Sequence, residues 1–162
     1  MSTPWLDVAT RLLNTKESPG PANNPLIIDW AKKLGGWVAS FYTKDEIPWC
    51  GLFVAHCLRE AGAQDLPGNP LSALAWSSYG GSTQARIGAV MVFQRPGGGH
   101  VGFYVGENSK AYLIGGGNQS DSVSDSWVAK DRLVAIRWPK DFPVTTSAKI
   151  LFQTGQLSRN EA

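Results

Sequence analysis

Apolar residues in the first part of the chain recur with a helical period. Residues 4–13 read PWLDVATRLL, with apolar positions three or four residues apart, and predict a short helix that begins at Pro4. Residues 25–36 read PLIIDWAKKLGG and predict a second helix that Gly35 and Gly36 close. Between them lies a loop rich in Pro, Gly and Asn.

A third helix is predicted within DEIPWCGLFVAHCLREAG, residues 45–62. Pro48 is typical of a first helical turn, so we expect Cys50 in that turn, and Gly62 is a plausible C-cap. One apolar stripe follows the helical spacing and predicts the buried face; it consists of Cys50, Phe53, Val54, Cys57, Leu58 and Ala61.

The period changes to that of strands in the second half. Residues 66–86 form a long connection, with one helical turn expected near residues 71–77. Four short runs rich in β-branched and aromatic residues follow, separated by Gly, Asn and Pro: residues 87–94, 100–107, 111–117 and 133–139. Because they are close in sequence, we expect hairpins in a small antiparallel sheet, and an α+β fold with the N-terminal helices packed on it.

Composition favours one globular domain over 1–139, followed by a peripheral tail over 140–162. Of 162 residues, 43% are apolar and 17% charged, which excludes a disordered chain. The net charge is +2 and no Lys/Arg run is present, so we expect no nucleic-acid partner. No apolar stretch approaches the roughly 18 residues of a membrane span, and the amino terminus has no leader pattern. We therefore expect a monomer that is cytoplasmic when made.

The two cysteines are expected to be free thiols. Cys50 and Cys57 lie seven residues apart in one predicted helix, which separates their Cα atoms by roughly 10 Å, whereas a disulfide tolerates about 7 Å. Together with His56 and His100 they show no zinc-binding spacing, so we expect no metal and no cofactor.

Cys50 has two interpretations: a buried residue of the apolar stripe, or a nucleophile at the start of a helix. Unpaired backbone N–H groups and the positive end of the helix dipole favour a thiolate in the first turn. Gly51 beside it would leave room for a bulky substrate. Cys57 lies two turns further in and is expected to be core.

A thiol nucleophile needs an imidazole within hydrogen-bond reach. His56 lies six residues along the helix, about 9 Å away and about 240° round from Cys50, so we expect a surface or half-buried side chain. His100 follows three glycines at the start of a strand, where a substrate can approach the backbone. It is therefore the candidate base.

The imidazole also needs a polar partner that fixes its tautomer. Asn118 and Gln119 end the next predicted strand, and in an antiparallel hairpin that end lies beside the start of the previous strand. Asn118 can thus lie beside His100, Asp121 is a weaker alternative, and Asn118 as a simple turn residue is the competing interpretation.

The order Cys50, His100, Asn118, with the cysteine opening a helix and the histidine opening a strand, resembles the CHAP family (cysteine, histidine-dependent amidohydrolase/peptidase). Further blocks of the chain resemble a phage- and prophage-associated branch related to NlpC-type enzymes, over roughly Pro4 to Pro139. They include DEIPWCGLFVAHCLREAG, GGHVGFYVGE and GGGNQSDSVS. The resemblance implies a papain-like fold with Cys50 as nucleophile, His100 as base and acid, and Asn118 as the orienting residue. Many members place a carboxylate near the third position, so Asn118 and Gln119 both stay open.

The resemblance further implies a peptidoglycan hydrolase, either an N-acetylmuramoyl-L-alanine amidase or a stem or cross-bridge endopeptidase. Such a phage endolysin or delivered lytic enzyme would act in the periplasm or cell wall, with a holin, phage tail or secretion system as partner. Trp49 and Trp76 are candidate cleft walls, although a place in the core is expected for most of the seven Trp. Asp45 and Glu46 precede the helix and would cap it or line the cleft. The alternatives are a catalytically silent wall-binding module and a thiol hydrolase acting on proteins.

Overall fold

The computed structural model of the chain describes residues 3–18, 22–44, 47–146 and 150–152. Helices come first along the chain and the sheet follows, as expected for an α+β fold. The helices are α1 (Pro4–Arg11), α2 (Pro25–Leu34), α3 (Gly36–Phe41) and α4 (Cys50–Glu60), with short 3-10 helices η1 (Ala73–Ser78) and η2 (Lys130–Arg132). The strands are β1 (Gly81–Ser82), β2 (Val90–Arg95), β3 (Gly98–Glu107), β4 (Ala111–Gln119), β5 (Ser122–Ala129) and β6 (Leu133–Trp138).

The strands form one antiparallel sheet in the order β1-β6-β2-β3-β4-β5. Hairpins join β2 to β3, β3 to β4 and β4 to β5, so neighbours in sequence are neighbours in space for most of the sheet. The prediction of an antiparallel sheet built from hairpins is confirmed. Strand β6, the last in the chain, pairs with β2 and with β1, the first two strands.

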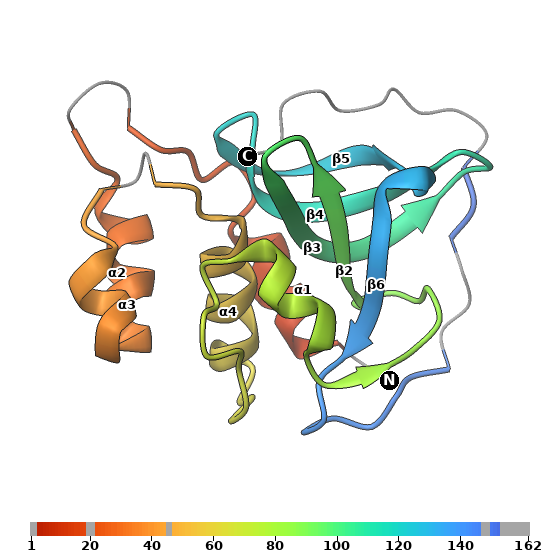
Figure 1. Cartoon of the computed structure of the whole chain (residues 1–162), viewed down its shortest axis with the longest axis horizontal. Helices are drawn as coiled ribbons and strands as arrows, with labels where there is room; N and C mark the ends of the chain where they lie inside the picture. Colours follow the sequence, from red (N-terminus) through yellow and green to blue (C-terminus); the bar gives the residue numbers. More distant parts are fainter. Residues whose placement is uncertain (1–2, 19–21, 45–46, 147–149, 153–162) are drawn as a thin grey trace.

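Helix α4 lies between the sheet and helices α2 and α3. It packs against β3, β4 and α1 on one side and against α2 on another. Figure 1 shows that α2 and α3 lie on the side of α4 that faces away from the sheet. The sequence predicted one buried stripe on α4, but every residue from Cys50 to Leu58 is buried. Elements cover the helix on several sides, so its small and apolar residues are all withdrawn from water.

The predicted helices over 4–13 and 25–36, and the one within 45–62, are present as the shorter helices α1, α2 and α4. Helix α4 begins at Cys50, with Trp49 at the N-cap position, so Pro48 precedes the helix instead of lying in its first turn. Gly35 ends α2 with φ of +73°, a conformation that glycine adopts readily, and α3 follows directly.

Strands β1 and β5 and helix α3 were not predicted. Strand β5 reads SVSDSWVA, too polar to match a buried strand, and it lies at the edge of the sheet beside β4. The segment after α1 also pairs with its start, through a bridge between Lys16 and Ser122. The backbone pairing with β4 stabilises β5 although few of its side chains are buried.

The described part of the tail packs back onto the domain. The ring of Phe142 contacts that of Trp5 at 5.0 Å, and Arg86 donates to the carbonyl of Thr145. Further along, Glu107 in β3 donates its N–H to Ile150 and accepts one from Phe152. Residues 150–152 thus lie alongside the end of β3.

Candidate active site

Cys50 is the first residue of α4, so its sulfur lies among the unpaired N–H groups of a helix N-terminus. Its own N–H and that of Gly51 lie within hydrogen-bond reach of Sγ. A third donor is the N–H of Val101 in β3. Because Val101 directly follows His100, the sulfur lies beside the strand that carries the imidazole.

Burial raises the pKa of the Cys50 thiol above its usual value, since only 3% of the residue is exposed. The three N–H groups and the positive charge of Arg95 act in the opposite direction and favour the thiolate. Burial has the larger effect. Burial thus favours the neutral thiol, and an attack by the sulfur calls for a base that takes its proton.

His100 is fully buried in β3, which pairs directly with β4, the strand that carries Gln119. The imidazole Nε2 lies 2.7 Å from Gln119 Oε1. Strand β3 begins at Gly98, so His100 is its third residue and not its first as expected. Gly98 and Gly99 instead begin the strand and line a pocket beside Cys50.

Gln119 fixes the tautomer of the imidazole. Its Nε2 donates to the carbonyl of Ile114 at 3.1 Å and to that of Ser124 at 2.6 Å. The amide is thus oriented with Oε1 toward His100, so the imidazole must donate from Nε2. The proton therefore resides on Nε2, and Nδ1 carries the lone pair that a base requires.

The hydrogen bond to His100 comes from Gln119, not from Asn118. Asn118 adopts a positive φ of +58° within a register shift between β4 and β5, and this turn carries the following side chain to the imidazole. The Asn118 side chain is buried, and its Oδ1 has no hydrogen-bond partner among the residues described. Asp121 lies exposed in the β4–β5 turn. Sequence reasoning had left Gln119 open beside Asn118, but the bulge that selects it has no sequence signature.

A pocket of about 180 Å³ opens beside Cys50. Its walls come from the start of α4, from the connection that leads into η1 together with the first residues of η1, and from the β2–β3 hairpin. The lining residues are Pro48, Cys50, Leu71, Ser72, Ala73, Leu74, Arg95, Gly98 and Gly99. The pocket is lined mostly by apolar residues and glycines, and it gives a substrate access to the nucleophile.

Neither Trp49 nor Trp76 lines this pocket. Both are fully buried, Trp49 against Trp30 with ring centroids 5.9 Å apart and Trp76 against Tyr79 at 4.9 Å. They are core residues, so their expected role as cleft walls is wrong. Asp45 and Glu46, expected near the cleft, lie outside the described residues.

Gly51 does not leave room for a substrate. A Cβ at this position would lie 2.1 Å from the carbonyl oxygen of Pro70, so the space is already filled by backbone. The glycine permits the connection before η1 to approach α4 closely. The expectation of open space at Gly51 is therefore wrong, and the pocket beside Cys50 is not lined by this glycine.

His56 and Cys57 belong to the core around α4. His56 is 7% exposed and stacks on Trp30 at 5.1 Å, so it is more deeply buried than expected. Burial lowers the pKa of His56 and raises that of Cys57 well above its usual value. Both cysteines are free thiols, as predicted.

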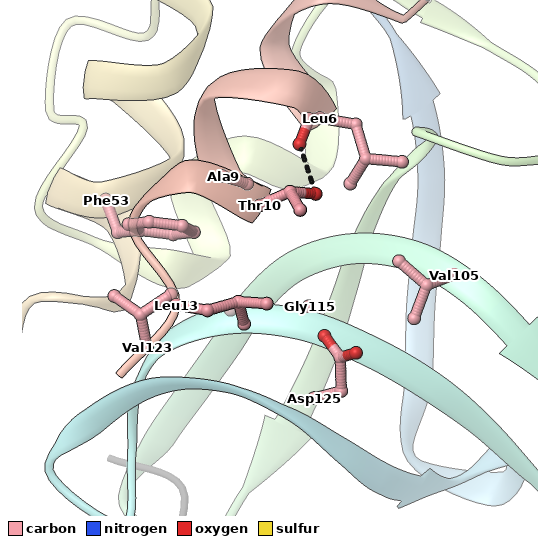
Figure 2. A pocket seen from close by; sticks show the side chains of 10 residues that line it. Leu6, Ala9, Thr10, Leu13, Phe53, Val105, Gly115, Val123 and Asp125 are labelled. Carbon is pink, nitrogen blue, oxygen red and sulfur yellow. Dashed lines mark hydrogen bonds between the residues drawn. The ribbon is translucent and has the colours of Figure 1, made fainter. Parts of the chain in front are cut away.

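A second cavity, of about 130 Å³, lies under α1 on strands β3 to β5 (Figure 2). Leu6 and Thr10 of α1 face Val105 and Asp125 across it. Partial burial raises the pKa of the Asp125 carboxyl. Gly116 lines this cavity too, and a Cβ added there would lie 3.5 Å from His100 Nε2. The two sites are thus separated by the backbone of β4.

In the described ranges, no group of three or more His, Cys, Asp or Glu side chains is placed to hold a metal ion. The same residues contain no helix with the length and apolar character that crossing a bilayer requires.

A buried thiol at a helix N-terminus, beside the strand that carries an imidazole held by an amide, fits the arrangement used for nucleophilic catalysis by cysteine. The comparison with known families agrees: the CHAP domain family model matches residues 42–118, just under half of the chain, with Cys50 and His100 inside the match. This match supports a cysteine- and histidine-dependent amidohydrolase or peptidase of the CHAP type. No curated protein and no solved structure matches the chain.

Proposed function

We propose that this chain is a peptidoglycan hydrolase that cleaves an amide bond through a thioester on Cys50. The observation that carries the proposal is the joint placement of three groups: the Cys50 sulfur, the Val101 N–H that donates to it, and the neighbouring His100 imidazole held by Gln119. The CHAP match points to the same class of chemistry.

In the proposed reaction, His100 Nδ1 takes the proton of the Cys50 thiol as the sulfur attacks the amide carbonyl. The tetrahedral oxyanion is stabilised by N–H groups at the start of α4, where the helix dipole is positive. His100 then gives its proton to the departing amine, and a water molecule hydrolyses the thioester with His100 again as base. Gln119 accepts the Nε2 hydrogen bond throughout and stabilises the imidazolium that forms.

The bond would be the N-acetylmuramoyl-L-alanine amide or one within the stem or cross-bridge, as in a papain-like enzyme of the CHAP and NlpC type. The sequence blocks that resemble phage-associated chains favour a phage endolysin or another delivered lytic enzyme. Expression in a bacterium with and without an added periplasmic leader tests this. Lysis only when the leader is present supports a need for delivery across the membrane, and lysis without the leader contradicts that need.

The decisive experiment is digestion of purified Gram-negative and Gram-positive sacculi, with soluble fragments identified by mass spectrometry. The wild type is compared with Cys50→Ala, and with Cys57→Ala as the matched thiol control. We expect fragments from the wild type and Cys57→Ala but not from Cys50→Ala, and their masses identify the bond. Binding to sacculi without cleavage by any variant would indicate a silent wall-binding module, and turnover of unfolded protein but not sacculi would indicate a protein hydrolase.

A further inference from the structure

The charge of Arg95 acts on the thiol of the candidate nucleophile. Arg95 ends β2 opposite Gly98 in the β2–β3 hairpin, and it lines the pocket beside Cys50. The other lining side chains are apolar or neutral, apart from the thiol itself. Among the described residues, the guanidinium therefore supplies the only formal positive charge in the pocket wall.

The guanidinium is oriented but not neutralised. Arg95 Nε donates to the carbonyl of Gly99 at 3.3 Å, which ties the group to the hairpin. Its two terminal nitrogens make no ion pair with a carboxylate in the part of the chain that the structure describes. A planar guanidinium with two available donors is suited to bidentate recognition of a carboxylate.

The rest of the pocket wall is mostly apolar, so it favours an apolar group beside the carboxylate of the substrate. Leu71, Ala73 and Leu74 form an apolar side opposite the hairpin, and Leu74 also closes on Gly99, where an added Cβ would lie 2.7 Å from Leu74 Cδ2. A pocket of about 180 Å³ with this wall suits an apolar side chain beside the carboxylate.

We propose that Arg95 is a specificity residue that binds a free carboxylate of the substrate, so that the enzyme prefers peptide amides carrying such a carboxylate close to the scissile bond. The proposal rests on the proposed function, because it places the substrate beside Cys50. It adds the chemical class of the substrate: acidic peptides with an apolar residue, in preference to their amidated counterparts.

The test uses two synthetic muropeptides that are identical except that one carboxylate near the scissile bond is free in the first and amidated in the second. For each, kcat and KM are measured with the wild type, Arg95→Gln and Arg95→Lys. Arg132→Gln is the matched control, because Arg132 also donates through Nε to a backbone carbonyl, that of Gln94, but lies outside the pocket. Thermal melting checks that each variant is folded.

We expect the wild type and Arg132→Gln to prefer the free carboxylate by about 10- to 100-fold in kcat/KM, as for one charge-assisted contact. Arg95→Gln should lose this preference through a higher KM for the acidic peptide, and Arg95→Lys should keep part of it. Loss of the Arg95 charge also affects the Cys50 thiol, but that effect is common to both peptides and cancels in their ratio.

The two possible failures are distinguishable. If no muropeptide is cleaved by the wild type, the proposed function fails. If both are cleaved and Arg95→Gln keeps the wild-type preference, or if the wild type shows no preference, the assignment of Arg95 is wrong while the hydrolase remains.

Discussion

At the scale of single residues, the candidate site depends on one hydrogen bond, from His100 Nε2 to Gln119 Oε1. Without it the imidazole would lose the partner that fixes its tautomer. We expect Gln119→Ala to lower kcat by about 10- to 100-fold, the loss expected for one hydrogen bond to a group that becomes charged. The measurement is kcat and KM on the fragment-release assay, with melting temperature as a check on folding.

The matched control is Asn118→Gly, since glycine tolerates the positive φ of that position. We expect it to keep most of the activity. If Asn118→Gly loses activity and Gln119→Ala keeps it, the orienting residue is Asn118, as the resemblance to the family first implied.

The two thiols should differ in reactivity toward iodoacetamide. Cys50 lines a pocket, whereas Cys57 is fully buried and does not line that pocket. Because burial raises the pKa of Cys50, its alkylation should be slower at pH 7.5 than that of a thiol in the unfolded chain and should rise with pH beyond the usual thiol range. Arg95→Gln should slow it further.

Peptide mapping by mass spectrometry identifies the labelled cysteine. We expect modification of Cys50 alone in the folded protein and of both cysteines in urea. Equal labelling of Cys57 under native conditions would contradict the burial on which this difference depends.

At the scale of secondary structure elements, the sequence predicted those with strong periodicity and missed those that depend on a neighbour. The apolar spacing in α1, α2 and α4 was sufficient to locate them. Strand β5 was missed because pairing with β4, rather than its own apolar residues, stabilises it. Likewise Cys50 and His100 could be identified as candidates from their positions in the sequence. That Gln119, and not Asn118, contacts the imidazole depends on a bulge that no local pattern encodes.

Helix α4 is held in place by close backbone approach at Gly51. An added Cβ would meet the Pro70 carbonyl at 2.1 Å, and backbone on both sides leaves little freedom to move. We therefore expect Gly51→Ala to destabilise the protein by about 1–3 kcal/mol or more, as overpacking does. Urea unfolding followed by tryptophan fluorescence measures the change.

Gly68→Ala is the control for this prediction. Gly68 lies in the same connection, has no atom within 4 Å of an added Cβ and needs no positive φ. Its substitution should change the free energy of unfolding by no more than about 0.5 kcal/mol. If Gly51→Ala is equally neutral, α4 and the Pro70 segment are not packed as closely as described.

At the scale of the whole molecule, stability should depend on pH through His56. This imidazole stacks on Trp30, lies 4.0 Å from Glu60, and is influenced by Lys33 and Asp29. Burial has the largest effect and lowers its pKa below the usual value of 6.5, although Glu60 and Asp29 act in the opposite direction. The charged form is thus less favourable in the folded state than in the unfolded state.

The sign follows from proton linkage. Between the lowered pKa of the folded state and 6.5, the unfolded chain binds more protons, so the free energy of unfolding falls as the pH falls. His56→Phe keeps an aromatic ring against Trp30 and removes the titration. The difference in stability between wild type and His56→Phe should therefore shift in favour of the variant from pH 7.5 to pH 5, measured by urea unfolding at each pH. A difference that stays constant over this range would show that folding does not lower the pKa of His56.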